Sequence, residues 1–127
     1  MFRINVIALG KNKGKWVDEA VAHYLKFLKK YAAVDIIYLP DVRKSRKLSD
    51  SELLRREAKL IENSLKSNHL VAPSDGGHRF DTMEFAGYLS RLMTASHSSI
   101  DFVIGGVCGI DQTILDRCDE IISLSPL

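Results

Sequence analysis

Short apolar segments with strand-like composition alternate with longer segments of helical periodicity along the whole chain. The expected strands are residues 2–9, 34–39, 69–72, 100–104 and 120–124. Two of them, 2–9 and 100–104, are almost continuously apolar, as strands covered on both faces are. Strands that alternate with helices need crossover connections between parallel neighbours. The sequence therefore predicts an α/β fold, with a mainly parallel five-stranded sheet and helices on both faces.

The helices are predicted from apolar residues at three- and four-residue steps and from capping residues. The first is expected to begin near residue 15, the second and third to cover about 50–67 and 82–95, and the last to follow Asp111. Ser49 with Glu52, and Asp81 with Glu84, have the spacing of a capping box. The sequence thus indicates where the second and third helices begin.

Size and composition fit one soluble domain over residues 1–127, with 46% apolar and 27% charged residues. No apolar run approaches the ~18 residues that a membrane helix needs. Asn5 interrupts the apolar stretch that a signal peptide would require. Two cysteines, Cys108 and Cys118, are too few for a disulfide framework. We therefore expect a cytoplasmic protein with reduced thiols and no membrane association.

The loops that directly follow the strands are the candidate ligand-binding segments, because open parallel sheets bind ligands beyond the carboxyl ends of their strands. Gly105, Gly106 and Gly109 follow the fourth strand. Their missing side chains would let backbone N–H groups approach a ligand, although a tight turn explains the spacing equally well. The position in the fold favours a ligand loop. The third strand is expected to end at Pro73, with a turn at Ser74–Gly77.

Three other motifs favour structural interpretations. Gly10–Lys15 fails as a phosphate-binding loop, because its glycine spacing is one residue short and Trp16 replaces the metal-binding Ser or Thr. Cys108 is expected to be a buried or turn thiol, since Ile114 stands where a phosphatase-type loop has Arg. No metal site is expected, because the four histidines show no close pair: His23, His69, His78 and His97.

A basic segment at 41–48 is the candidate RNA contact. Its four positive charges, Arg43, Lys44, Arg46 and Lys47, form an electrostatic footprint for phosphates. A solvated loop is a nearly equal alternative. The formal net charge of +2 is too small to decide between them.

Taken together, several segments resemble the ribosomal RNA large subunit methyltransferase H family of SPOUT methyltransferases. They are the 2–10 strand, the helix with Trp16 and Tyr24, the 68–78 segment, the I-G-G-x-x-G loop at 104–109 and the S-L-S-x-L ending at 123–127. The resemblance covers the whole chain. It implies an α/β fold with a C-terminal trefoil knot, a homodimer, and methylation of N3 of a pseudouridine in large-subunit rRNA of the assembled ribosome. The implied methyl donor is S-adenosylmethionine.

The resemblance also implies three cofactor-binding segments and assigns no catalytic base. These segments are Pro73 and Ser74, Gly105 and Gly106, and Ser125, Pro126 and Leu127. The family usually has Leu-Asp and Gly-Lys where this chain has Pro73-Ser74 and Gly77-His78. One backbone donor is lost at Pro73, because proline has no N–H.

The family continues beyond S-L-S-x-L with a loop and a long helix that thread the knot and make most of the dimer contact, whereas this sequence ends at Leu127. We therefore expect a SPOUT-like, unknotted domain without the knot segment, monomeric or aggregating, with no measurable binding of S-adenosylmethionine. Two hypotheses follow. The protein is a methyltransferase of the family represented by a shortened chain, or it is an inactive remnant that at most binds RNA or a protein partner.

Overall fold

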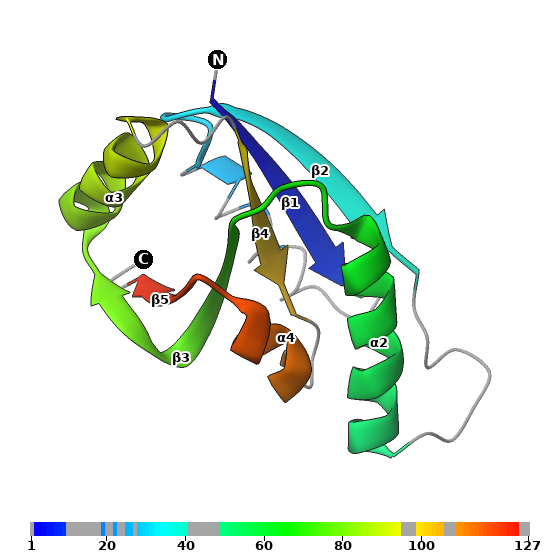
Figure 1. Ribbon diagram of the computed structural model, residues 1–127. Helices are drawn as coiled ribbons and strands as arrows, with labels where there is room; N and C mark the ends of the chain where they lie inside the picture. Colours follow the sequence, from blue (N-terminus) through cyan, green and yellow to red (C-terminus); the bar gives the residue numbers. More distant parts are fainter. Residues whose placement is uncertain are drawn as a thin grey trace.

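The computed structural model describes residues 2–9, 19, 22, 25–26, 28–40, 49–94, 99–105 and 109–124. Five strands form one sheet in the order β2-β1-β4-β3-β5, and their pairs are parallel (Figure 1). The strands are β1 Arg3–Leu9, β2 Ala33–Leu39, β3 Leu70–Phe80, β4 Ser99–Ile104 and β5 Glu120–Leu124. The parallel five-stranded sheet is therefore confirmed, and β4 lies between β1 and β3, as its continuous apolar character predicts.

Helices cover both faces of this sheet. They are α2 Asp50–Ser64, α3 Thr82–Thr94 and α4 Gln112–Arg117, and the described residues between 19 and 28 are also helical. Figure 1 shows α3 and α2 on opposite sides of the strands. Leu28 and α3 pack on one face, and α2 and α4 pack on the other.

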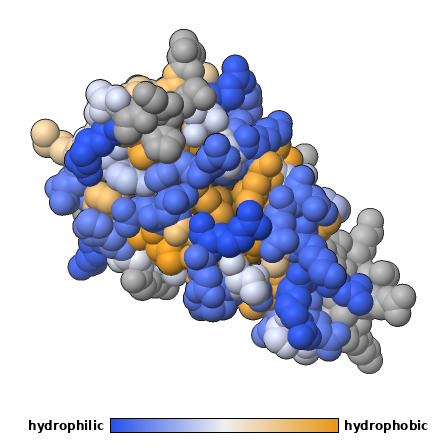
Figure 2. Space-filling view, in the orientation of Figure 1, coloured by the Kyte–Doolittle hydropathy of each residue, from blue (hydrophilic) through white to orange (hydrophobic). Residues whose placement is uncertain are grey.

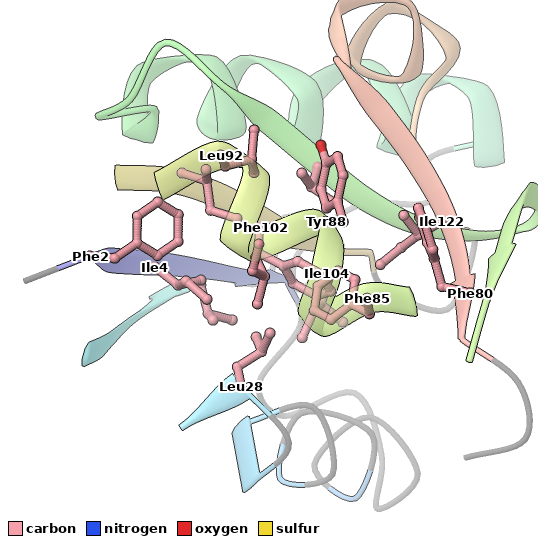
Figure 3. Close-up of a cluster of buried hydrophobic side chains, with 14 of the residues drawn as sticks. Phe2, Ile4, Leu28, Phe80, Phe85, Tyr88, Leu92, Phe102, Ile104 and Ile122 are labelled. Atoms are coloured by element: carbon pink, nitrogen blue, oxygen red, sulfur yellow. The ribbon is translucent and has the colours of Figure 1, made fainter. Parts of the chain in front are cut away.

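Each face of the sheet has its own buried cluster. Ile4 and Val6 of β1 point to the cluster that contains Phe85 of α3 (Figure 3). The next residues of the same strand, Ile7 and Leu9, pack with α2 and α4. Because successive side chains of a strand alternate between faces, burial on both sides explains why β1 is apolar at nearly every position.

Helix α2 is amphipathic. Its buried side includes Leu53, Ala58 and Ile61. Figure 2, in the orientation of Figure 1, shows hydrophilic side chains over the outer surface of α2. This helix ends at Ser64, three residues before the end that its periodicity predicts near residue 67.

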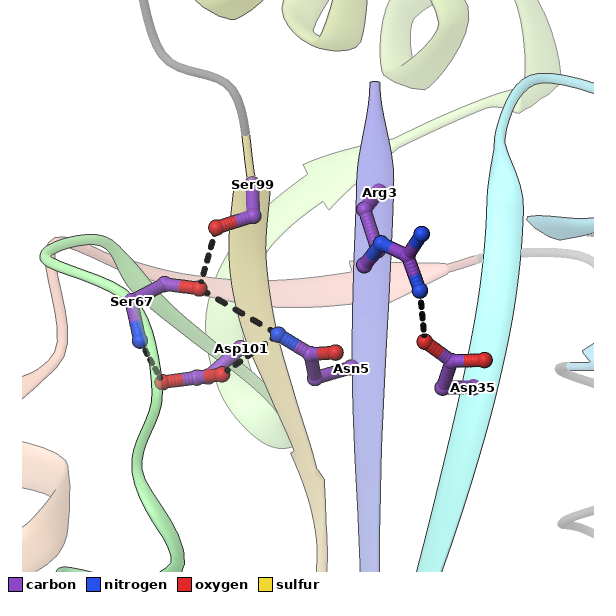
Figure 4. A network of polar contacts seen from close by, with 6 residues as sticks. All are labelled: Arg3, Asn5, Asp35, Ser67, Ser99 and Asp101. Atoms are coloured by element: carbon purple, nitrogen blue, oxygen red, sulfur yellow. Dashed lines mark hydrogen bonds and ion pairs between the residues drawn. The ribbon is translucent and has the colours of Figure 1, made fainter. Parts of the chain in front are cut away.

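A buried carboxylate explains the earlier end of α2. Asp101 of β4 is fully buried, and its Oδ2 accepts hydrogen bonds of 2.9 Å from the backbone N–H groups of Lys66 and Ser67 (Figure 4). Its Oδ1 accepts a bond of 3.3 Å from Asn5 Nδ2. Residues after Ser64 therefore leave the helix to donate hydrogen bonds to a carboxyl group of β4, a long-range contact that local periodicity does not report.

The prediction of a turn at Ser74–Gly77 is wrong. These residues lie inside β3, which continues to Phe80. The pairing with β5 shifts register there, because Pro73 and His78 both pair with Ile122. The segment is thus a bulge in a continuing strand, since β5 supplies backbone partners on both sides of it.

The capping box at the start of α3 is confirmed, and its removal is expected to be measurable. Asp81 Oδ1 accepts from the Glu84 N–H at 2.7 Å, and Glu84 Oε1 accepts from the Asp81 N–H at 3.1 Å. Asp81→Ala should lower the free energy of unfolding in urea by about 1 kcal/mol. Glu52→Ala at the start of α2 leaves α3 capped and serves as the comparison. A loss below about 0.3 kcal/mol would show that the cap contributes little.

Candidate functional site

One described member of the implied cofactor site, Gly105, lies at the carboxyl edge of the sheet. The chain leaves β1 towards β2 on one side and leaves β4 towards β5 on the other, which makes this edge a topological switch point. Gly105 directly follows β4. The pairing of β3 with β4 ends at Val71 and Phe102, three residues before Ser74 and Gly105.

The turn after β4 is tight. A Cβ atom at Gly105 would lie 2.6 Å from both the Gly109 carbonyl oxygen and Ile110 Cγ1. Gly109 has a φ of +84°, in the left-handed region that favours glycine. Both glycines therefore serve the shape of this turn.

The other described members, Pro73 and Ser74, are half-buried. They stand at the start of the bulge within β3, and not beyond the end of the strand as expected. The remaining implied cofactor residues lie outside the described part of the chain: Gly106, Ser125, Pro126 and Leu127. The basic segment does so as well, with Arg43, Lys44, Arg46 and Lys47, and so do Gly10–Lys15, Cys108, His23 and His97.

A polar cluster that sequence reasoning missed lies at the opposite edge. His69 Nε2 and the Tyr88 hydroxyl are 2.6 Å apart, and His69 Nδ1 is 3.8 Å from Asp119 Oδ2. The ring of Tyr88 packs in the core while its hydroxyl points out of the cluster of apolar side chains (Figure 3). Burial, together with the negative charges of Glu120 and Asp119, raises the pKa of Tyr88 well above its usual value, so the hydroxyl keeps its proton.

This cluster is not part of the candidate site. His69 directly precedes β3 and Asp119 directly precedes β5, at the amino ends of the strands. Only the adjacency of β3 and β5 brings these two residues together, and no local pattern in the sequence reports that adjacency.

Among the residues that the structure describes, no three His, Cys, Asp or Glu side chains are grouped so that they could hold a metal ion. Nor does any helix among those residues have the length and apolarity needed to cross a membrane.

Cys118 is expected to react slowly with alkylating reagents. Burial raises the pKa of its thiol to about 11, and the charge of Asp119 adds to the effect. At pH 8 the folded protein should be labelled by iodoacetamide about 100-fold more slowly than the unfolded chain, because only the thiolate reacts. The rate should rise with pH up to about 11. Peptide mass spectrometry reads Cys118 separately from Cys108, and equal rates in native and denaturing buffer would contradict the expectation.

Comparison with known proteins supplies the family. Residues 2–127 match the family described as "Predicted SPOUT methyltransferase". The chain is 34% identical over 128 residues to proteins named ribosomal RNA large subunit methyltransferase H from Bacillus thuringiensis (strain Al Hakam), Bacillus cereus (strain B4264) and Bacillus anthracis (strain CDC 684 / NRRL 3495). The alignment spans 98% of this chain and 80% of each relative. By this match along its length and this identity, the chain belongs to the SPOUT methyltransferase family.

Proposed function

We propose that the protein transfers a methyl group from S-adenosylmethionine to N3 of a pseudouridine in large-subunit rRNA, acting in the cytoplasm on the assembled ribosome. The proposal is supported chiefly by the similarity of the chain, along 98% of its length, to proteins named ribosomal RNA large subunit methyltransferase H, and by the position of Gly105 directly after β4 at the switch point. The resemblance implies a homodimer, whereas the expectation from the sequence is a monomer or an aggregate, and light scattering on the purified protein decides between them.

The described residues at this edge fit such a donor. Gly105 lies in a turn where a Cβ atom would collide with Gly109 and Ile110, so a side chain there would displace the backbone that we assign to the donor. Ser74 is half-buried and has a hydroxyl that can donate or accept a hydrogen bond. Pro73 offers only its carbonyl group, so it can accept but not donate. We assign donor binding to these residues and, by resemblance, to Gly106, Ser125, Pro126 and Leu127.

In this proposal the residues of the protein orient the methyl donor and the acceptor base. When bound, S-adenosylmethionine supplies an electrophilic methyl group on its sulfonium sulfur. The acceptor nitrogen must lose its proton and face that methyl group in line, and holding two reactants in this geometry can account for about 7–11 kcal/mol of a barrier. The segments around Ser74 and Gly105 are proposed to fix the donor while the RNA contact fixes the base.

Calorimetric titration with S-adenosylmethionine tests the donor, and transfer of radiolabelled methyl to ribosomes that lack the modification tests the reaction. If the proposal holds, the protein binds the donor at micromolar concentration and labels large-subunit rRNA, which is the opposite of the expectation attached above to the ending at Leu127. A folded protein that binds ribosomes but neither binds the donor nor transfers the label would support the inactive, RNA-binding hypothesis instead.

The basic segment is proposed to contact rRNA phosphates. Changing Arg43, Lys44, Arg46 and Lys47 to alanine should reduce the slope of log affinity against log salt for ribosome binding by about three, since each lost phosphate contact removes ~0.7–0.9 from the slope. Filter binding at several salt concentrations measures it.

Three exposed basic residues of α2 provide a matched control for charge alone. Changing Arg55, Arg56 and Lys59 to alanine lowers the net charge by a similar amount without altering the basic segment. An unchanged slope in the variant of the basic segment would return that segment to the solvated-loop alternative.

A further inference from the structure

The bulge in β3 is not needed for pairing with β5. Before it, Ala72 pairs with Ile121 and Pro73 with Ile122. After it, His78 pairs with Ile122 again and Arg79 pairs with Ser123. If residues 74–78 were absent, Pro73 and Arg79 would continue the ladder against Ile122 and Ser123 without a break. The five residues therefore serve something other than the sheet.

One residue closes this bulge against the neighbouring strand. A Cβ atom at Gly77 would lie 2.7 Å from the backbone C and O of Ile121 and 2.8 Å from the backbone C of Ile122. These are main-chain atoms of a strand held in a ladder, so they cannot turn aside as the end of a side chain would. Ordinary contact begins at 3.4 Å, so any side chain at position 77 has to move the bulge away from β5 by about 0.7 Å.

We propose that Gly77 is a positioning residue for the methyl donor: its close contact with β5 holds the bulge of β3 in the shape that presents Pro73 and Ser74 at the binding edge. The inference rests on the proposed function and adds to it a residue that does not itself touch the donor. A displacement of this size, three residues from Ser74, suffices to misplace a bound ligand, because shifts near 1 Å cost about 100-fold in well-oriented sites.

The variant Gly77→Ala tests the inference. We expect its dissociation constant and KM for S-adenosylmethionine to rise at least about tenfold, with the KM for ribosomes unchanged, because only the donor side of the site moves. Gly87→Ala in α3 is the matched control, since a Cβ atom there meets nothing nearer than Arg91 Nη1 at 3.7 Å. Ile61→Val, a core change in α2, controls for lower stability alone. Both controls should keep wild-type donor affinity.

Deletion of residues 74–78 is the second variant, should Gly77→Ala fail to fold. It should melt cooperatively, because its ladder with β5 is continuous, and should not bind the donor. Wild-type donor affinity in either variant overturns the inference while leaving the proposed function intact. A deletion variant that cannot fold also overturns it, because the bulge would then serve the sheet. Absence of donor binding in the unaltered protein defeats the proposed function itself and the inference with it.

Discussion

Gly105→Ala is expected to lower the rate of methyl transfer at least about 100-fold in a protein that remains folded. The new Cβ atom would stand 2.6 Å from the Gly109 carbonyl oxygen and from Ile110 Cγ1. The turn after β4 would have to open, and the backbone that we assign to the donor would move with it. Initial rates of label transfer at saturating ribosome concentration measure the loss.

Two further measurements separate this effect from general damage. The far-UV circular dichroism of Gly105→Ala should match that of the unaltered protein, because the strand and helix on either side of the turn keep their own bonds. Gly87→Ala adds the same methyl group in an open helical position and should retain full activity. Activity within about twofold of the unaltered protein in Gly105→Ala would remove this turn from the candidate site.

The second large effect is on stability, at Asp101. Replacing this fully buried carboxylate by alanine would leave the backbone N–H groups of Lys66 and Ser67 without their acceptor and the Asn5 amide with Ser67 Oγ alone. The free energy of unfolding should fall by about 3–5 kcal/mol, since unsatisfied buried groups carry their full desolvation cost. The melting temperature should fall by roughly 10 °C or more.

The neighbouring edge of the sheet provides a matched control for Asp101. Asp35 of β2 forms an ion pair with Arg3, and both side chains are more than half exposed (Figure 4). Asp35→Ala should cost at most about 1 kcal/mol, because exposed ion pairs contribute little. Equal losses for the two aspartates in urea titrations would contradict the structural role that we assign to Asp101.

Most helices and strands of this fold could be predicted from the sequence, because apolar periodicity and capping residues determine where they lie. The continuous apolar runs of β1 and β4 reflect burial on both faces, and the capping spacing of Asp81 and Glu84 marks the start of α3 within a residue. The end of α2 could not be predicted in the same way. It is set by Asp101, which accepts hydrogen bonds from the backbone amides of Lys66 and Ser67. These residues lie 35 and 34 positions from Asp101 along the chain.

The candidate site was predictable only in part, for a related reason. The glycines after β4 and their place at the carboxyl edge follow from the strand–helix alternation, whereas Pro73 and Ser74 came from the family resemblance. The bulge that contains Ser74 depends on register with β5, and the proximity of His69 and Asp119 depends on strand order. Neither the register nor the order of the strands can be predicted from a short stretch of neighbouring residues.

The position of β1 has a consequence for how the protein is made. Its first residue, Arg3, pairs with Ser99, so the central strand pair of the sheet joins segments 96 residues apart. At about 5–20 residues per second, the ribosome needs several seconds to make β4 after β1 has been synthesised. Until then β1, an apolar strand, can pair only with β2, and the backbone groups on its other edge have no partner strand. Such late closure makes folding slow and exposes the nascent chain to aggregation, so the yield of this protein should depend on chaperones that bind apolar strands during translation.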